Sequence, residues 1–104
     1  MILFIDTCKS DSVRFALIPK KGARSRAAQK TFPLARNANH ATLALLEEFL
    51  RAKKIVPKDI TKIIACSGPG SFNGVRVGIT IAQALGLAWS LPVKTIPAGE
   101  TAKW

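Results

Sequence analysis

Two residue types that build most catalytic and metal sites are scarce in this sequence. Its 104 residues include one histidine, His40, and two cysteines, Cys8 and Cys66. Two cysteines are too few for a disulfide framework, so we interpret both as reduced residues packed in the core. Nucleophilic catalysis also has little support, because the cysteines have a single histidine to share and Ser71 has no evident base.

The sequence also lacks any apolar run of the roughly 18 residues that a transmembrane helix needs. Its first residues, MILFIDTCKSD, have neither the basic start nor the small-residue cleavage site of a secretory leader. We therefore expect a cytoplasmic protein. Residues 1–104 are long enough for one domain with a single core.

Acidic residues are few. The sequence has six Asp and Glu and sixteen Lys and Arg, which gives a net charge of +10. The basic residues form two clusters, one of Lys20, Lys21, Arg24, Arg26, Lys30 and Arg36, and one of Arg51, Lys53, Lys54, Lys58 and Lys62. Such clusters attract polyanions, but they are also typical of a solvated surface. Both interpretations stay open. The candidate RNA contacts are Lys20, Lys21, Arg24, Arg26 and Lys30, although no aromatic platform accompanies them.

The apolar pattern predicts three strands followed by alternating helices and strands. Residues 1–7 and 12–19 are predicted strands, and a long loop over 20–29 leads to a third short strand around 30–34. Residues 61–67 and 92–96 supply a buried fourth strand and a last strand. The order predicts an α/β fold, with a mixed five-stranded sheet and helices packed on it.

The first predicted helix begins at Asn39, which we interpret as its N-cap. Leu43, Leu46 and Leu50 fall on one face of this helix. The second helix extends from about Ser71 to Ser90 and is apolar nearly all round, apart from a narrow stripe of Arg76, Thr80, Gln83 and Ser90.

Small residues recur every fourth position along the second helix, at Gly74, Gly78, Ala82 and Gly86. This ridge would allow another helix to approach closely. A helix on one face of a small sheet needs only one apolar side, so the excess predicts a partner. That partner is either the first helix alone or the first helix together with another chain.

The segment CSGPGSFNG, residues 66–74, has the form of a phosphate-binding loop between a strand and a helix. The lysine of a Walker A loop is missing from it. Two interpretations remain, a nucleotide contact and a tight turn that starts the second helix, and we favour the turn.

Three features together resemble the TsaB family: the N-terminal ILFIDT, His40 at the start of a leucine-rich helix, and the segment IIACSGPGSFNGVRVGITIAQALGLAWSLPV. TsaB is the accessory subunit of the bacterial machinery that makes threonylcarbamoyladenosine in tRNA. The family's loop pattern is matched by Gly68, Pro69, Gly70, Ser71, Phe72, Gly74, Val75, Arg76 and Gly78, while Asn73 replaces a threonine. The resemblance covers nearly the whole chain and is weakest between Lys20 and Ala38.

The resemblance implies one ribonuclease-H-like lobe of the actin-like ATPase (ASKHA) fold. Only the family's first lobe is matched, and of a naturally minimal member and a fragment we favour the former. In the implied strand order the first and fourth strands run parallel and adjacent, so the α-carbons of Cys8 and Cys66 should lie within about 12 Å of each other. The superfamily's cleft uses an acid from each lobe, so the resemblance implies a vestigial nucleotide or anion site of Asp6, Gly68, Gly70, Ser71 and Gly74.

The resemblance also implies a non-catalytic subunit. The family's catalytic relatives hold a metal with two histidines one helical turn apart, and here Ala44 stands where the second would be. We therefore interpret His40 as a capping or packing residue, with ATP and metal bound by the catalytic partner and no cofactor by this chain. The expected partners are a TsaD-like catalytic subunit, a TsaE-like ATPase, tRNA through the complex and, for the chain alone, a second copy. The expected protein interface consists of Leu43, Leu46, Leu50, Gly78, Ala82, Leu85, Gly86 and Trp89.

Two other classes of function stay open. One is a self-contained nucleotide- or metal-dependent enzyme of the peptidase-like branch, which a tight ATP or metal site on the isolated chain would reveal. The other is a charge-driven tRNA-binding module, which would bind tRNA without a protein partner and with a steep salt dependence.

Overall fold

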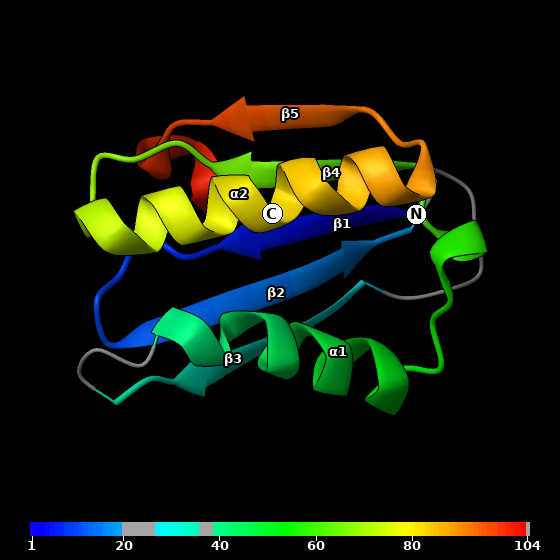
Figure 1. The fold of residues 1–104 in the computed structure, drawn as a ribbon, viewed down its shortest axis with the longest axis horizontal. Helices are drawn as coiled ribbons and strands as arrows, with labels where there is room; N and C mark the ends of the chain where they lie inside the picture. Colours follow the sequence, from blue (N-terminus) through cyan, green and yellow to red (C-terminus); the bar gives the residue numbers. More distant parts are fainter. Residues whose placement is uncertain (20–26, 36–38, 104) are drawn as a thin grey trace.

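A computed structural model of the chain contains a five-stranded sheet with two α-helices, α1 (Thr42–Ala52) and α2 (Phe72–Trp89), on one face (Figure 1). The structure describes residues 1–19, 27–35 and 39–103. Within these ranges, no helix has both the length and the apolar character needed to cross a membrane. The predicted α/β class is confirmed.

Three strands form an antiparallel meander. β1 (Ile2–Asp6) pairs with β2 (Ser12–Ile18), and β2 pairs with β3 (Ala28–Pro33). β3 begins before the predicted start near Lys30, because its pairing with β2 continues to Ala28, opposite Leu17. The pairing of β1 with β2 places Asp6 opposite Arg14.

The remaining two strands run parallel to β1. β4 (Lys62–Cys66) pairs with β1, and β5 (Val93–Ile96) pairs with β4, which gives the order β3-β2-β1-β4-β5. α2 connects β4 to β5, as a parallel pair requires a long crossover. The prediction that the first and fourth strands are parallel neighbours is confirmed. Their carboxyl ends therefore meet at one edge of the sheet.

The strands alternate their side chains between the two faces of the sheet. On the helix-covered face, strand residues such as Leu3 and Phe15 join Leu46 and Phe49 of α1 and Ala82 of α2 in the main core cluster. A second, smaller cluster on the other face consists of Phe4, Ala16, Ile64 and Ile96. Each side of the sheet thus has its own apolar packing.

Short 3-10 turns precede or follow several elements. They are η1 (Asn39–Ala41) before α1, η2 (Pro57–Asp59) before β4 and η3 (Ala98–Lys103) after β5. Because the chain enters α1 through η1, the N-cap is Ala41, without a side-chain cap hydrogen bond. The predicted N-cap at Asn39 is therefore wrong.

Candidate protein interface and the glycine loop

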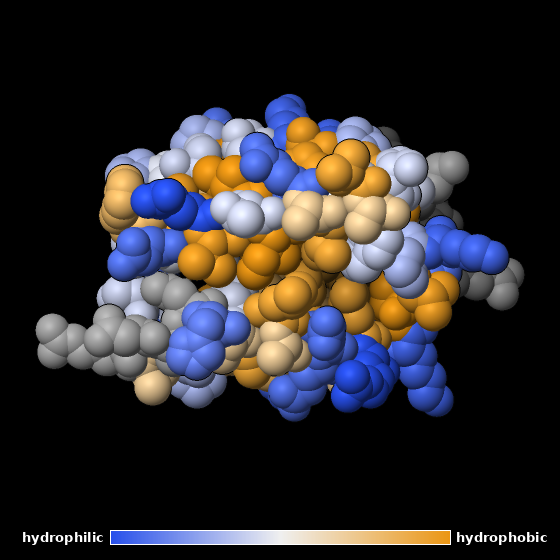
Figure 2. Space-filling model, viewed as in Figure 1, coloured by the Kyte–Doolittle hydropathy of each residue, from blue (hydrophilic) through white to orange (hydrophobic). Residues whose placement is uncertain are grey.

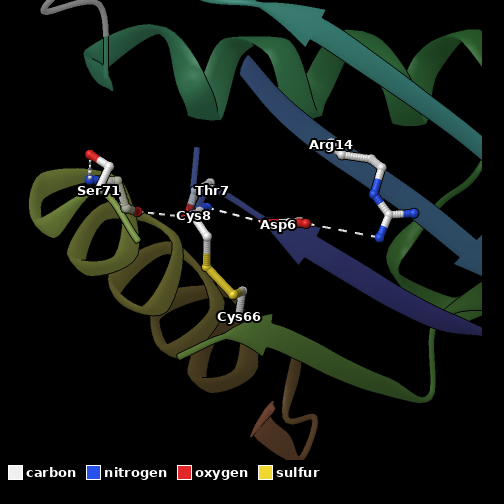
Figure 3. Close-up of a disulfide and its surroundings, with 7 residues drawn as sticks. Asp6, Thr7, Cys8, Arg14, Cys66 and Ser71 are labelled. Atoms are coloured by element: carbon white, nitrogen blue, oxygen red, sulfur yellow. Dashed lines mark hydrogen bonds and ion pairs between the residues drawn. A yellow bond between two sulfur atoms is a disulfide. The ribbon is translucent and has the colours of Figure 1, made fainter. Parts of the chain in front are cut away.

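α2 begins at a tight turn that is held against the end of β1 (Figure 3). Ser71 is the N-cap, and its hydroxyl oxygen accepts a hydrogen bond from the Gly74 N–H at 3.3 Å. The Ser71 N–H donates to the Cys8 carbonyl at 2.6 Å. The Thr7 hydroxyl donates to the Gly74 carbonyl, also at 2.6 Å. The helix start is thus fixed to the two residues that follow β1.

Several groups of the loop backbone are used within the chain. The N–H groups of Ser71 and Gly74 already donate within the chain, and Pro69 has none. Gly70 packs so closely on the Cys8 carbonyl that a Cβ would have no room. Gly68 has a φ of 94°, which glycine adopts without strain. These contacts support the tight turn at the start of α2.

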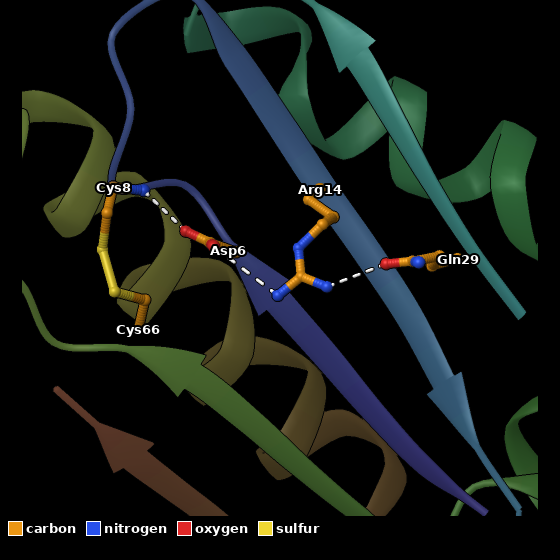
Figure 4. Close-up of polar contacts among 5 residues, drawn as sticks. All are labelled: Asp6, Cys8, Arg14, Gln29 and Cys66. Atoms are coloured by element: carbon orange, nitrogen blue, oxygen red, sulfur yellow. Dashed lines mark hydrogen bonds and ion pairs between the residues drawn. A yellow bond between two sulfur atoms is a disulfide. The ribbon is translucent and has the colours of Figure 1, made fainter. Parts of the chain in front are cut away.

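Asp6 is held by two partners within the chain (Figure 4). One carboxylate oxygen accepts a hydrogen bond from the Cys8 N–H at 3.1 Å. The other lies 3.9 Å from the Arg14 guanidinium, which also donates to the Gln29 side-chain oxygen at 2.9 Å. The polar partners of Asp6 thus come from β2 and from the residue two positions after it in the chain.

The small-residue ridge of α2 faces the sheet of its own chain. All four members, Gly74, Gly78, Ala82 and Gly86, are buried. A Cβ on Gly78 would meet the Thr7 hydroxyl, and one on Gly86 would meet the Val93 side chain. The prediction that Gly78, Ala82 and Gly86 contact another chain is therefore wrong. The ridge serves the close approach of α2 to β1 and β5.

The other predicted interface residues differ in how far they reach the surface. Leu46 is 1% exposed and belongs to the core, so its assignment to a partner interface is also wrong. Leu50, Leu85 and Trp89 are half-buried and pack against the main core cluster. Leu43, at the start of α1, is 44% exposed and remains available to a partner.

The outer side of α2 carries large apolar side chains that are not among the predicted interface residues. Phe72 is 72% exposed and Leu87 is 86% exposed. The Arg76 guanidinium lies 5.4 Å from the centre of the Phe72 ring. An open hollow on this side is lined by Asn73, Arg76, Val77, Thr80 and Ile81. A helix turns by 100° per residue, and at this spacing Phe72 and Leu87 fall outside the side of α2 that carries the glycine ridge. Their position relative to the ridge was the sequence signal that could have identified them.

Figure 2 shows hydrophobic residues gathered on the face that carries the two helices, over α2 and between α2 and α1. We use the name helix face for the exposed residues Leu43 of α1 and Phe72 and Leu87 of α2, together with Val77 and Ile81 from the lining of the hollow. Its polar members include Arg76 and Thr80, both exposed. A mixed surface with large apolar side chains and an arginine has the composition of a protein interface.

The structure describes only some of the predicted RNA contacts. Lys20, Lys21, Arg24 and Arg26 lie outside the described residues. Lys30 is exposed on β3, with its ammonium nitrogen 4.8 Å from the centre of the Phe32 ring. His40 is exposed in η1, so a packing role for it is wrong.

Cys8 and Cys66 form a disulfide, which corrects the expectation of two reduced residues. Their α-carbons are 6.4 Å apart, so the predicted closeness is confirmed. The cause is the parallel pairing of β1 with β4, which ends both strands at the same edge. An α-carbon distance in this range permits the two sulfurs to bond.

The chain is similar to proteins of tRNA modification. Residues 32–100 match the family model described as TsaD, tRNA N6-adenosine threonylcarbamoyltransferase. The chain is 34% identical over 65 residues to the tRNA threonylcarbamoyladenosine biosynthesis protein TsaB of Bacillus subtilis (strain 168), which covers 61% of this chain and 28% of that protein. It is 37% identical over 51 residues to TsaB of Buchnera aphidicola subsp. Schizaphis graminum, or 49% of this chain and 24% of that protein.

The fold also resembles a solved structure, YeaZ from Pseudomonas aeruginosa. The TM-score is 0.78 at 25% identity, and the match covers 92% of this chain and 43% of that chain. With the family match, this likeness confirms the expected actin-like, ASKHA-type fold. The matched part of the chain spans about a quarter of the length of these curated relatives, 28% of one and 24% of the other.

Proposed function

Since this chain belongs to the family of TsaD, tRNA N6-adenosine threonylcarbamoyltransferase, and is a TsaB-type member of it, we propose that it is an accessory subunit in the synthesis of threonylcarbamoyladenosine. In this role it binds a TsaD-like catalytic subunit and supports transfer of the threonylcarbamoyl group to tRNA. ATP and metal are held by that catalytic subunit. A TsaE-like ATPase and tRNA join through the complex, and a second copy of the chain occupies the same surface when the catalytic subunit is absent.

The exposed outer side of α2 is the observation that carries this proposal. The inner side of the helix is already packed on the sheet through its glycine ridge, yet Phe72 and Leu87 remain 72% and 86% exposed. When a partner covers exposed apolar side chains, apolar surface is removed from water, and this favours binding. The helix face therefore offers a TsaD-like subunit a surface that the chain's own fold does not use.

The supporting role, rather than a catalytic one, rests on the chemistry of the few reactive side chains. The two cysteine sulfurs are bonded to each other and cannot act as nucleophiles in this state. The chain's single histidine, His40, is exposed in η1, just before α1, and Ala44, four residues later, offers no ligand. The transfer chemistry is accordingly assigned to the partner.

A charge substitution on the helix face tests the proposal. Leu87→Glu should weaken binding to a TsaD-like subunit about 30-fold, because losing a central apolar contact costs about 2 kcal/mol. The matched control is Val56→Glu, since Val56 is also exposed, at 53%, but lies in the connection after α1. Circular dichroism should show both variants folded.

The measurement is the dissociation constant of each variant with the catalytic subunit, together with threonylcarbamoyladenosine formed by the mixture. Equal affinity for Leu87→Glu and the parent would remove the helix face as the binding surface. A folded parent chain that neither binds the subunit nor raises product formation would contradict the accessory role itself.

A further inference from the structure

Three side chains of metal-ligating type meet at the edge of the sheet where β1 and β4 end. Asp6 is the last residue of β1, Cys66 is the last residue of β4, and Cys8 follows Asp6 by two positions. One oxygen of Asp6 and the two cysteine sulfurs all lie within 4.8 Å of one another. Figure 4 shows the carboxylate and the sulfurs on the same side of the strand ends.

We propose that reduction of the Cys8–Cys66 disulfide creates a binding site for Zn²⁺, or a similar thiolate-preferring divalent ion, with Cys8, Cys66 and Asp6 as ligands. A dithiol reductant supplies two electrons and two protons, so the S–S bond breaks, two thiols form and the reductant becomes a disulfide. The metal then replaces the two thiol protons, which pass to solvent. The site is independent of the helix face and of the proposed accessory function.

The backbone already holds the ligands at a suitable spacing. Zinc binds thiolate at about 2.3 Å in a tetrahedral site, which puts two sulfur ligands roughly 3.8 Å apart. The α-carbons of Cys8 and Cys66 are 6.4 Å apart, so side-chain rotation alone can part the sulfurs to this distance. The Asp6 oxygen is already within 4.8 Å of both. Three protein ligands leave the fourth position for water.

The surroundings of Asp6 would orient the carboxylate and balance the charge of the site. The Cys8 N–H donates to one carboxylate oxygen at 3.1 Å, and the Arg14 guanidinium lies 3.9 Å from the other. Two thiolates and a carboxylate carry one more negative charge than a divalent ion neutralises. Arg14, which also donates to Gln29, lies where it offsets that charge. Outer partners of this kind hold first-coordination ligands in place.

Cobalt(II) is the probe, because tetrahedral thiolate sites give it a sulfur-to-metal charge-transfer band and intense visible absorption. The full chain is reduced with a dithiol, freed of reductant under nitrogen and titrated with Co²⁺, and Zn²⁺ is then added. We expect one Co²⁺ per reduced chain, displacement by one Zn²⁺, and no charge-transfer band for the oxidised chain.

Single substitutions test each ligand. Cys8→Ser and Cys66→Ser should abolish the charge-transfer band of a two-thiolate site, and Asp6→Asn should weaken binding at least as much as the roughly 10–100-fold cost of losing an outer partner. Asp11→Asn, at an exposed acid nearby, is the matched control and should bind like the parent. Circular dichroism checks the fold of each variant.

Failure of the reduced parent to give the band at millimolar Co²⁺ would overturn the site. Full binding by either serine variant would overturn it as well. Parent-like affinity in Asp6→Asn would remove the carboxylate from the ligand set and thereby contradict the proposal as stated.

Discussion

At the scale of single residues, Thr7 links the end of β1 to α2. Its side chain is 1% exposed, and its hydroxyl donates to the Gly74 carbonyl at 2.6 Å. The same hydroxyl occupies the space that a Cβ on Gly78 would need. One threonine thus fixes both the start of α2 and how closely the helix lies on the sheet.

The crowding at Thr7 predicts that Gly78→Ala lowers the free energy of unfolding. A methyl group there must displace Thr7 or lift the helix, at a cost of about 1–3 kcal/mol for overpacking. This outweighs the gain of up to about 1 kcal/mol that alanine normally brings to a helix. Urea denaturation followed by circular dichroism measures the difference.

Gly99→Ala is the control, because a Cβ on Gly99 would meet nothing within 4 Å. It should leave the urea midpoint close to that of the parent. A Gly78→Ala protein as stable as the parent would show that α2 does not lie as closely on Thr7 as described.

At the scale of elements, the N-terminus of α2 depends on the Ser71 cap. Ser71→Ala removes the acceptor for the Gly74 N–H and should lower the free energy of unfolding by about 0.5–2 kcal/mol. Ser67→Ala is the control, since Ser67 is exposed and its N–H rather than its side chain bonds to Ile96. Chemical denaturation of both variants compares them, and an equal loss in each would argue against a specific capping effect.

The disulfide joins two elements that already pair through their backbones. It connects residues 58 positions apart, so its reduction should lower the free energy of unfolding by about 2–4 kcal/mol. Denaturation of the chain with and without a dithiol, in the presence of a metal chelator, measures the effect. Identical midpoints under both conditions, with thiol titration confirming reduction, would contradict a stabilising link.

The elements themselves could be predicted from apolar periodicity, because Leu3, Phe15 and Ile63 alternate with residues of the opposite face. Which side of α2 faces the sheet could not be predicted in this way. A ridge of Gly78, Ala82 and Gly86 has the same sequence pattern whether it meets a helix or a strand. The outcome depends on Thr7, which the fold brings to the ridge from the other end of the chain, and on Val93 of the strand that follows α2.

The candidate site was less predictable than the fold for a related reason. The closeness of Cys8 and Cys66 follows from the parallel order of β1 and β4, yet composition alone suggested reduced thiols. Exposure of Phe72 and Leu87 depends on what the rest of the chain leaves uncovered. That quantity is a property of the packed structure and is absent from local sequence patterns.

At the scale of the whole molecule, the charge of +10 bears on contact with tRNA. Reversing charge at Arg24, Arg26 and Lys30 should weaken tRNA association and reduce its salt dependence, because fewer counterions are released on binding. Binding to a TsaD-like subunit should be unaffected. Filter binding at several salt concentrations measures this, and unchanged tRNA affinity at low salt would exclude the first basic cluster as an RNA contact.

The central claim is that the helix face binds a TsaD-like catalytic subunit. Hydrogen exchange measured by mass spectrometry on the chain alone and in the mixture tests it most directly, because amides covered or stabilised by a partner exchange more slowly. We expect slower exchange in peptides from α1 and α2, including Thr42–Ala52 and Phe72–Trp89, with little change in β3. Slower exchange confined to β2 and β3, with both helices unchanged in a mixture that forms a complex, would contradict it.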